Sequence, residues 1–463
     1  MILARLLTPE EVGIFSLCAA FLAVATIFRD FGISEYIIQE KELTKEKLSG
    51  AYALTFLAAW LMAGALYLAR PYIAEFYNEP GLQDILNILC INFLILPIAS
   101  PTFALLNREM NFQCIFKIQV TATAVHAITA VTLASQGYSF MSLAWASLAN
   151  IAVQTLMLIY YKPEQGRVLP NFANMGTPLK FGALFSSSRT IEVVMSNSHE
   201  FIISRQFGFT ALGLFSRALG LINLFWQNIT SAVTRVAAPA FASAFHNSPD
   251  DLRDLYIRMT AIFTGIAWPF FSFAAIEAER IIFVLFGSQW LEAAPIASIL
   301  MVGTLIGSIS NLAPNVLIAA GQVKKRFYIT LLMAPVHIIG IAIASFYSLH
   351  HIAYVWIIGS LFGLALYNYH LYRTVTVNFV QVFKASKSSA ITAAITTGVI
   401  LASHQIIAHY DIHGFIALFI QSTLALLSWL TGIYLTRHPL NLEISKILVM
   451  ANQYLQEKRG PNA

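Results

Sequence analysis

The chain has 463 residues, of which 57% are hydrophobic and only 11% are charged. Soluble domains carry about 25% charged residues, and the mean hydropathy of this chain is +0.68. The composition therefore excludes an ordinary soluble enzyme and predicts a polytopic membrane protein. The formal net charge of +5 is compatible with a nucleic-acid partner only if the cations gather on one surface patch.

Thirteen stretches are long and apolar enough to cross a bilayer, which takes about 20 residues. In chain order they are 12–33, 49–69, 85–104, 118–135, 139–161, 181–203, 212–234, 259–276, 294–320, 327–347, 353–372, 389–408 and 414–436. They lack the alternating pattern of a β-barrel strand, so we expect helices, whose backbone hydrogen bonds close internally. The predicted fold class is an all-α polytopic membrane protein.

The cations are distributed unevenly between the two sides of the membrane. When alternate loops are assigned to opposite sides, one side holds only Arg5, Arg70, Arg205, Arg217 and Arg280. Arg29 and Arg189 lie inside spans, and the other cations, including Arg235 and the run 324–326, fall on the opposite side. The positive-inside rule makes that side cytoplasmic. The pattern predicts a cytoplasmic C-terminus and no nucleic-acid partner.

Two stretches, 5–16 and 205–216, read almost alike and keep Arg, Gly, Phe and Ser at the same offsets. A duplicated helical bundle is expected of a transporter that binds its substrate between the two repeats. We expect an N-terminal lobe at 1–162, a cytoplasmic linker at 163–180, a C-terminal lobe at 181–373, and two additional spans with a cytoplasmic tail at 374–463. These boundaries predict two pseudo-symmetric bundles followed by a pair of extra helices.

The repeat also predicts a missing element. The second copy is preceded by the full span 181–203, whereas the first copy begins almost at Met1. We therefore expect that the first helix of the first lobe is largely absent from this chain, and that the reading frame upstream of Met1 encodes about 20 apolar residues.

Charges inside a membrane are costly and usually face a cavity or a partner. The span 181–203 holds Arg189, Glu192, His199 and Glu200. The spacing places Arg189, Glu192 and His199 near one helical face. One interpretation is that this face lines a central pathway, in which Arg189 attracts an anionic head group. The other is that Arg189 and Glu192 neutralise each other as an i,i+3 pair. Buried, Glu192 or Glu200 would be a candidate proton carrier.

Arg29 and Asp30 close the first full span. They are either an interfacial ion pair or one lip of the same cavity. The sequence contains no phosphate-cradling glycine loop, no nucleophile elbow and no zinc-protease helix, so no motif indicates an enzyme, a cofactor or a metal ion.

The opening run Ala4-Arg5-Leu6-Leu7-Thr8-Pro9-Glu10-Glu11-Val12-Gly13-Ile14-Phe15 resembles a conserved block of bacterial polysaccharide flippases. The turn Arg29-Asp30-Phe31-Gly32 and the segment 197–218 are similar to further motifs of that family, although His199-Glu200 stands where an Asp is more usual. The resemblance covers nearly the whole chain. It is closest to the Wzx and colanic-acid-exporter type of the multidrug/oligosaccharidyl-lipid/polysaccharide exporter superfamily.

The resemblance implies fourteen helices, arranged as two six-helix lobes around a central cavity plus two extra helices, and no covalent catalysis. It implies an inner-membrane flippase for undecaprenyl-diphosphate-linked oligosaccharide in exopolysaccharide, lipopolysaccharide or capsule synthesis. Its partners would be that lipid, the bilayer, and polysaccharide polymerase and chain-length proteins. A multidrug-extrusion-type antiporter is the alternative in the same class. A membrane oligosaccharide polymerase or ligase is the alternative in another class, although the short outer loops argue against it.

Overall fold

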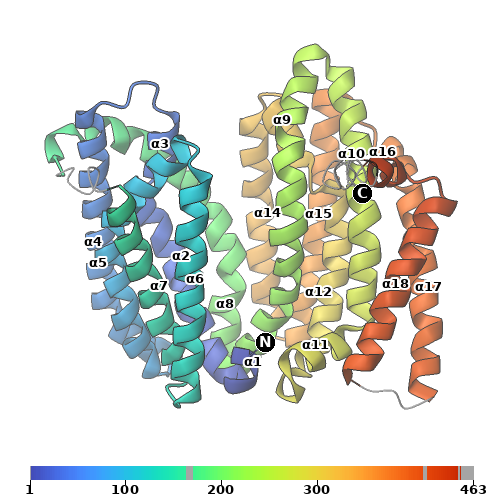
Figure 1. Cartoon of the computed structure of the whole chain (residues 1–463), viewed down its shortest axis with the longest axis horizontal. Helices are drawn as coiled ribbons and strands as arrows, with labels where there is room; N and C mark the ends of the chain where they lie inside the picture. The colour runs from blue at the N-terminus through green and yellow to red at the C-terminus, as the bar shows by residue number, and fades with distance from the viewer. Residues whose placement is uncertain (1, 163–169, 410–413, 447–448, 450–463) are drawn as a thin grey trace, which may run out of the picture. The chain divides into compact units, whose positions relative to one another are not determined.

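The computed structural model describes residues 2–162, 170–409, 414–446 and 449, and no β-strand occurs among them (Figure 1). Twelve helical stretches in this described part are long and apolar enough to cross a membrane. Each of the thirteen predicted spans overlaps one of them, because the stretch Arg189–Asn247 contains most of 181–203 and all of 212–234. The prediction of an all-α polytopic membrane protein is confirmed.

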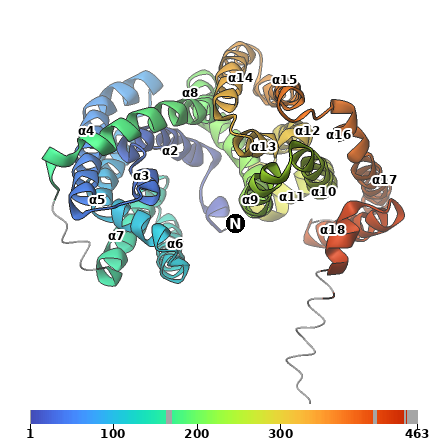
Figure 2. The ribbon, with the colours of Figure 1, turned by 90° about the horizontal axis from the view of Figure 1, so that it is seen from above.

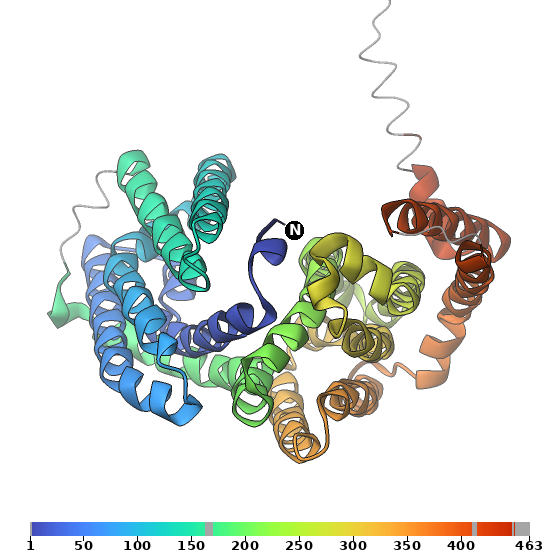
Figure 3. The same cartoon turned by 90° about the horizontal axis from the view of Figure 1, so that it is seen from below.

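The chain forms two compact units, Met1–Ser216 and Arg217–Ala463. The helices of the first unit are α1 (Ile2–Leu6), α2 (Pro9–Asp30), α3 (Ile33–Gln39), α4 (Lys45–Tyr77), α5 (Gly81–Arg108), α6 (Phe112–Ser135), α7 (Met141–Tyr161), the 3-10 turn η2 (Phe172–Asn174) and most of α8 (Gly176–Phe225). Within this unit α4 packs against α5, α6 against α7, and α2 against both α4 and α5 (Figure 2). The short helix α1 precedes α2 at the end opposite α3 (Figure 1). In the view from below, α1 is seen ahead of α2 at the start of the chain (Figure 3).

The second unit begins in the last turns of α8 and continues into the π-helical segment η3 (Trp226–Thr230). Its other elements are α9 (Ser231–Asn247), α10 (Pro249–Ile276), α11 (Ala278–Phe286), η4 (Ser288–Trp290), α12 (Ala293–Gly307), η5 (Ser308–Ser310), α13 (Ala313–Ala319), α14 (Val323–Ala344), α15 (Leu349–Val375), α16 (Phe379–Ala385), α17 (Lys387–His409) and α18 (Gly414–Leu435). Within this unit α12 packs on α15, and α17 packs on both α10 and α18.

The sequence predicts a short outer loop between 203 and 212, and the structure has a kink there. Two helices join within α8 at Gly208, which departs from helical geometry with φ 80° and ψ 179°. Because this backbone conformation is open almost only to glycine, one residue does the work of a loop. The span windows missed this because a single glycine leaves the apolar pattern on both sides intact.

The two copies of the repeat contact each other through equivalent glycines. A Cβ atom on Gly13 would lie 1.9 Å from the carbonyl oxygen of Phe209, and one on Gly213 would lie 1.8 Å from the carbonyl oxygen of Pro9. Position 209 is the repeat equivalent of position 9, so the contact is the same in both directions, as in a two-fold interface. Only glycine permits backbones to approach this closely.

This contact predicts a specific intolerance to a single methyl group. Gly13→Ala or Gly213→Ala should force α2 and α8 apart and destabilise the protein by about 1–3 kcal/mol, as overpacking of a tight contact does. The measurement is the thermal unfolding midpoint of the purified protein in detergent. Gly220→Ala is the matched control on α8, because nothing lies within 4 Å of its added Cβ; equal midpoints for all three variants would contradict the assignment.

A buried histidine ties the end of the second unit to α10 and α17. His438 follows α18, outside the membrane-spanning helices, and is 1% exposed. The Leu440 N–H donates to its Nδ1 at 3.1 Å, so its Nε2 carries the proton and donates to Ser389 Oγ at 2.9 Å. Ser389 Oγ in turn donates to the Ala261 carbonyl at 3.1 Å. Burial lowers the pKa of His438 to about 4.

The lowered pKa of His438 predicts a loss of stability in mild acid. The unfolded chain takes up a proton below its usual value near 6.5, whereas the folded protein does so only near pH 4. The stability is therefore complete above pH 6.5 and declines by about 3 kcal/mol as the pH falls toward 4. In a pH series of unfolding midpoints, His438→Gln should remove most of this slope, and an unchanged slope would contradict the prediction.

Candidate functional site

The candidate site begins at the sharp turn that ends α2. Phe31 closes the helix in the left-handed conformation with φ 42°, and Gly32 follows with φ 64°. The Phe31 N–H still donates to the Ile27 carbonyl at 3.0 Å, which caps the helix. The chain therefore leaves α2 abruptly, and α3 starts at Ile33 beside the end of α2.

Arg108 holds the far end of α3. This side chain, at the end of α5, donates to the carbonyl oxygens of Ile37 at 2.6 Å, Glu40 at 2.5 Å and Lys41 at 3.4 Å. The last carbonyls of a helix have no partner within the helix, and a cation there also suits the helix dipole. The Arg108 side chain thus holds the C-terminal end of α3 against α5.

The helix α8 passes close to the same turn at Gly182. A Cβ atom on Gly182 would lie 2.0 Å from the Phe31 carbonyl oxygen. The helices α2 and α8 therefore approach closely at two levels, at Gly13 with Gly213 and at Phe31 with Gly182. The two helices are antiparallel. Between these two contacts, α2 residues 23–30 therefore face α8 residues 186–197.

A cavity of about 370 Å³ lies in this interval. Its walls come from α2, the turn, α3 and α8, and the lining residues are Ala23, Thr26, Ile27, Asp30, Gly32, Ser34, Glu35, Ser186, Arg189, Val193 and Asn197. Among the described residues, the Ser186 hydroxyl is buried and has no hydrogen-bond partner. The cavity thus offers hydroxyl, amide, carboxylate and guanidinium groups to a ligand.

Two of the predicted site residues, Asp30 and Arg189, meet at this cavity although they are far apart in the sequence. Asp30 accepts from its neighbour Arg29, with Nη2 at 2.6 Å and Nε at 2.8 Å from Oδ1. The Arg29 side chain is only 12% exposed and its guanidinium lies 5.5 Å from the Phe93 ring centroid. Arg29 is therefore committed to Asp30 and to cation–π packing.

Arg189 is the accessible cation of the cavity. Its side chain is 59% exposed, and its Nη1 lies 3.2 Å from Oε2 of Glu192. Glu192 itself is not among the lining residues. An exposed ion pair of this kind contributes little stability, so a ligand anion competes for the guanidinium at small cost.

His199 and Glu200 form a separate buried pair further along α8. His199 Nε2 lies 3.1 Å from Glu200 Oε1, and both side chains are largely buried. The His199 ring packs on Phe215 with 5.4 Å between ring centroids. Neither residue lines the cavity. The helical face predicted for Arg189, Glu192 and His199 is therefore split into an accessible part and a packed part.

A second polar surface, which the sequence analysis missed, follows on α8, η3 and α9. Asn223, Gln227, Asn228 and Arg235 are exposed along this continuous helical stretch. Arg235, which the sequence pattern assigns to the cytoplasmic side, lies in α9, and its Nη2 is 3.4 Å from Ser231 Oγ. The spacing of four residues from 223 to 227, and of eight from 227 to 235, was the available signal.

The exposed side chains of this surface are more polar than those expected on a helix that faces lipid. Exposed amides and a guanidinium in a membrane-crossing stretch are costly unless they face water or a polar partner. The π-helical turn at Trp226–Thr230 interrupts the surface, and such turns occur frequently at functional sites. We name Asn223, Gln227, Asn228 and Arg235 the polar stripe.

Neither region, within the described residues, has a cluster of side chains that could hold a metal ion, since no group of three or more His, Cys, Asp or Glu side chains is placed to do so. The cavity instead has the features of a binding site: few charges, several neutral polar groups and close helix packing above and below.

The twelve long apolar helical stretches of the described residues define a polytopic membrane protein, and it has a polar cavity between its helices. A family model described as "Polysaccharide biosynthesis protein" matches residues 2–295. The chain belongs to this family.

Two relatives illustrate the family. The chain is 27% identical over 339 residues to the teichuronic acid biosynthesis protein TuaB of Bacillus subtilis, covering 71% of this chain and 68% of TuaB. It is 25% identical over 345 residues to the lipopolysaccharide biosynthesis protein WzxC of Escherichia coli, covering 73% and 70%.

Solved structures agree on the fold. The lipid II flippase MurJ in an inward closed conformation has a TM-score of 0.75 at 15% identity, covering 94% of this chain and 95% of MurJ. An inward-facing multidrug resistance MATE transporter has a TM-score of 0.62 at 14% identity, covering 81% and 93%. The resemblance inferred from the opening block is thereby confirmed at the level of family and fold.

Proposed function

We propose that this protein flips an undecaprenyl-diphosphate-linked oligosaccharide across the bacterial inner membrane. The observation that carries the proposal is the cavity between α2 and α8, with the accessible Arg189 at its wall. A sugar diphosphate cannot cross hydrocarbon unaided, because each unpaired polar group costs several kcal/mol there. A cavity that supplies a guanidinium and several hydroxyl and amide groups replaces the water that the head group loses.

The relatives support the substrate class. TuaB, WzxC and the succinoglycan biosynthesis transport protein ExoT of Rhizobium meliloti are named for the synthesis or transport of polysaccharides. The structural neighbour MurJ is titled a lipid II flippase. For this chain we infer a pathway of exopolysaccharide, lipopolysaccharide or capsule synthesis, with polymerase and chain-length proteins as downstream partners.

Movement would follow from the duplicated architecture. Two lobes at 1–162 and 181–373 that rock about a shared site expose it to each side in turn. Arg189 would attract the diphosphate, and Arg29, which is already paired with Asp30, is the weaker second candidate. On the second unit, the polar stripe is a separate candidate surface for sugar hydroxyl groups. Transport of this kind breaks and forms no covalent bond.

The role of Arg189 can be tested in cells that lack the native protein. Arg189→Ala should lower polymer export by about 10- to 100-fold, which is the effect of losing one charge-assisted hydrogen bond to the diphosphate. Arg189→Lys should keep part of the activity, since it keeps the charge but not the planar fork. Export is measured as surface polymer at matched levels of membrane-inserted protein.

The control is Arg253→Ala. Arg253 pairs with Asp250 and Asp254 at the start of α10, so its loss removes an arginine and leaves export unchanged.

A flipping defect leaves the single lipid-linked repeat on the cytoplasmic leaflet, whereas a polymerase defect leaves it on the outer leaflet. Wild-type export by stably inserted Arg189→Ala would overturn the proposal, and drug sensitivity without any export defect would favour the multidrug antiporter.

The proposed orientation places the C-terminus in the cytoplasm. Single cysteines at Lys325 and Lys387 should react with a membrane-impermeant thiol reagent only after the cells are opened, and cysteines at Glu79 and Glu292 should react in intact cells. The native cysteines Cys18, Cys90 and Cys114 are buried, so the background should be low. Reaction of Lys387 and Glu292 positions from the same side would refute the topology.

A further inference from the structure

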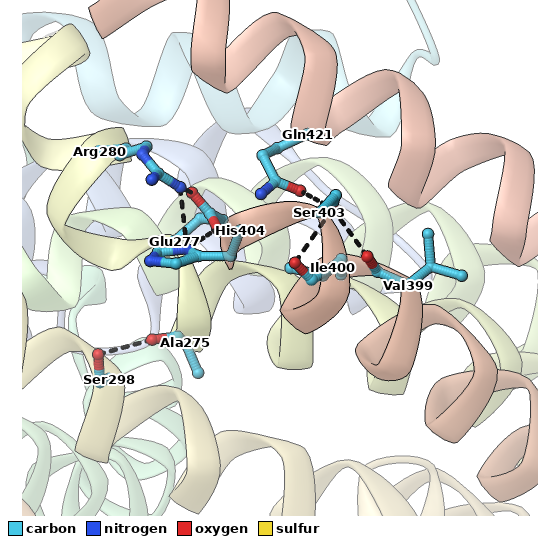
Figure 4. Close-up of polar contacts among 9 residues, drawn as sticks. All are labelled: Ala275, Glu277, Arg280, Ser298, Val399, Ile400, Ser403, His404 and Gln421. Atoms are coloured by element: carbon cyan, nitrogen blue, oxygen red, sulfur yellow. Dashed lines mark hydrogen bonds and ion pairs between the residues drawn. The ribbon is translucent and has the colours of Figure 1, made fainter. Parts of the chain in front are cut away.

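A charged cluster around the buried Glu277 joins α10 and α11 to α17 (Figure 4). Glu277 lies between α10 and α11, and its side chain is completely buried. Its Oε2 accepts from Arg280 Nη1 at 2.7 Å, and its Oε1 lies 2.9 Å from Nδ1 of His404 on α17. A buried carboxylate needs such partners, because an unpaired charge there costs several kcal/mol.

One nitrogen of this cluster has two incompatible neighbours. His404 Nδ1 is 2.9 Å from Arg280 Nη1 as well as 2.9 Å from Glu277 Oε1. A neutral ring with a bare Nδ1 accepts from the guanidinium and repels the carboxylate oxygen. A ring protonated at Nδ1 donates to the carboxylate and repels the guanidinium. The proton at this nitrogen therefore decides which residue His404 engages.

The cluster lies between two helix groups, and hydrogen bonds hold each group together. On one side, Ser298 Oγ on α12 donates to the Ala275 carbonyl at 2.7 Å, which fixes the end of α10. On the other side, Ser403 Oγ on α17 donates to Gln421 Oε1 on α18 at 2.8 Å. The hydrogen bonds of Glu277 with His404 thus connect the α17–α18 pair to α10–α12.

We propose that Glu277, Arg280 and His404 form a proton-binding site that sets how firmly the α17–α18 pair is held on α10 and α11. With His404 protonated, Glu277 is paired with two cations, one from each side of the contact, and the bond to α17 becomes charge-assisted. With His404 neutral, Arg280 is the only cation of the three residues that pairs with Glu277, and a hydrogen bond from the ring is no longer charge-assisted. Acidification therefore tightens the contact and alkalinisation loosens it.

The surroundings of the cluster leave the imidazole of His404 as its accessible proton-binding side chain. Histidine is the side chain that ordinarily titrates between pH 5 and 8, and the His404 side chain is 41% exposed, so protons reach it. Glu279 on α11 is exposed. The helices α12 and α18 contribute no charged residue near the cluster, and the His409 side chain lies outside the described residues. Because the predicted topology puts Arg280 on the outer side, the site would respond to the external pH.

The test is hydrogen–deuterium exchange of the purified full-length protein in detergent at pH 6 and pH 8, corrected for intrinsic exchange rates. The readout is the protection factor of α17 amides in residues 397–407, which surround His404. Wild-type protein should show about three- to tenfold higher protection at pH 6 than at pH 8, the range of a charge-assisted over a neutral hydrogen bond. The effect has the opposite sign to that of His438, which weakens the fold in acid.

Three variants make the test specific. His404→Asn keeps a polar group near Nδ1 but does not titrate, so its protection should be equal at both pH values. His404→Lys is permanently charged and should show high protection at both. His351→Asn removes an exposed histidine that contacts Ser348 at the start of α15 and should behave like wild type. An unchanged pH dependence in His404→Asn, or wild-type protection that does not change with pH, would overturn the proposal.

Discussion

The close contact of α2 with α8 is the constraint on which the candidate site depends. At Gly13 and Gly213 the two backbones are so close that an added Cβ atom would lie within 2 Å of a carbonyl oxygen. At Gly182 an added Cβ atom would lie 2.0 Å from the Phe31 carbonyl oxygen of the α2–α3 turn. Between these levels α2 and α8 also contact each other through the rings of Phe21 and Phe201, whose centroids are 4.9 Å apart. The cavity lies between this ring contact and the α2–α3 turn. The polar groups of the site are thus positioned by glycines that carry no chemistry themselves.

The symmetry of the glycine contact gives a structural reason for one matched position of the sequence repeat. Each copy supplies one glycine and one carbonyl to the same interface, so a side chain at either glycine position breaks both halves of the contact. The cavity next to it is lined by unlike residues from α2 and α8, as a site for an asymmetric ligand requires.

The spans could be predicted from the sequence because a bilayer demands about 20 apolar residues in a row, and that signal is local. The meeting of Asp30 and Arg189 could not, since it depends on how α2 and α8 pair in space. His199 follows Arg189 at helical spacing, yet it packs on Phe215, because burial of a face is decided by the neighbouring chain. Glu277 escaped notice for a simpler reason: it falls one residue beyond the end of a predicted span, where a carboxylate looks like part of a loop.

The ionisable groups of the membrane-spanning region differ in one respect that bears on the proposed function. Arg29 and Glu277 are shielded with their partners, and removing one member of a buried pair leaves an uncompensated charge. Arg189 is paired with Glu192 but remains accessible. A diphosphate can therefore take the place of the Glu192 carboxylate, because both are anions that accept from the guanidinium fork. For the proposed substrate, Glu192 then acts as a stand-in anion, which neutralises Arg189 when the cavity is empty and weakens its hold on the departing head group.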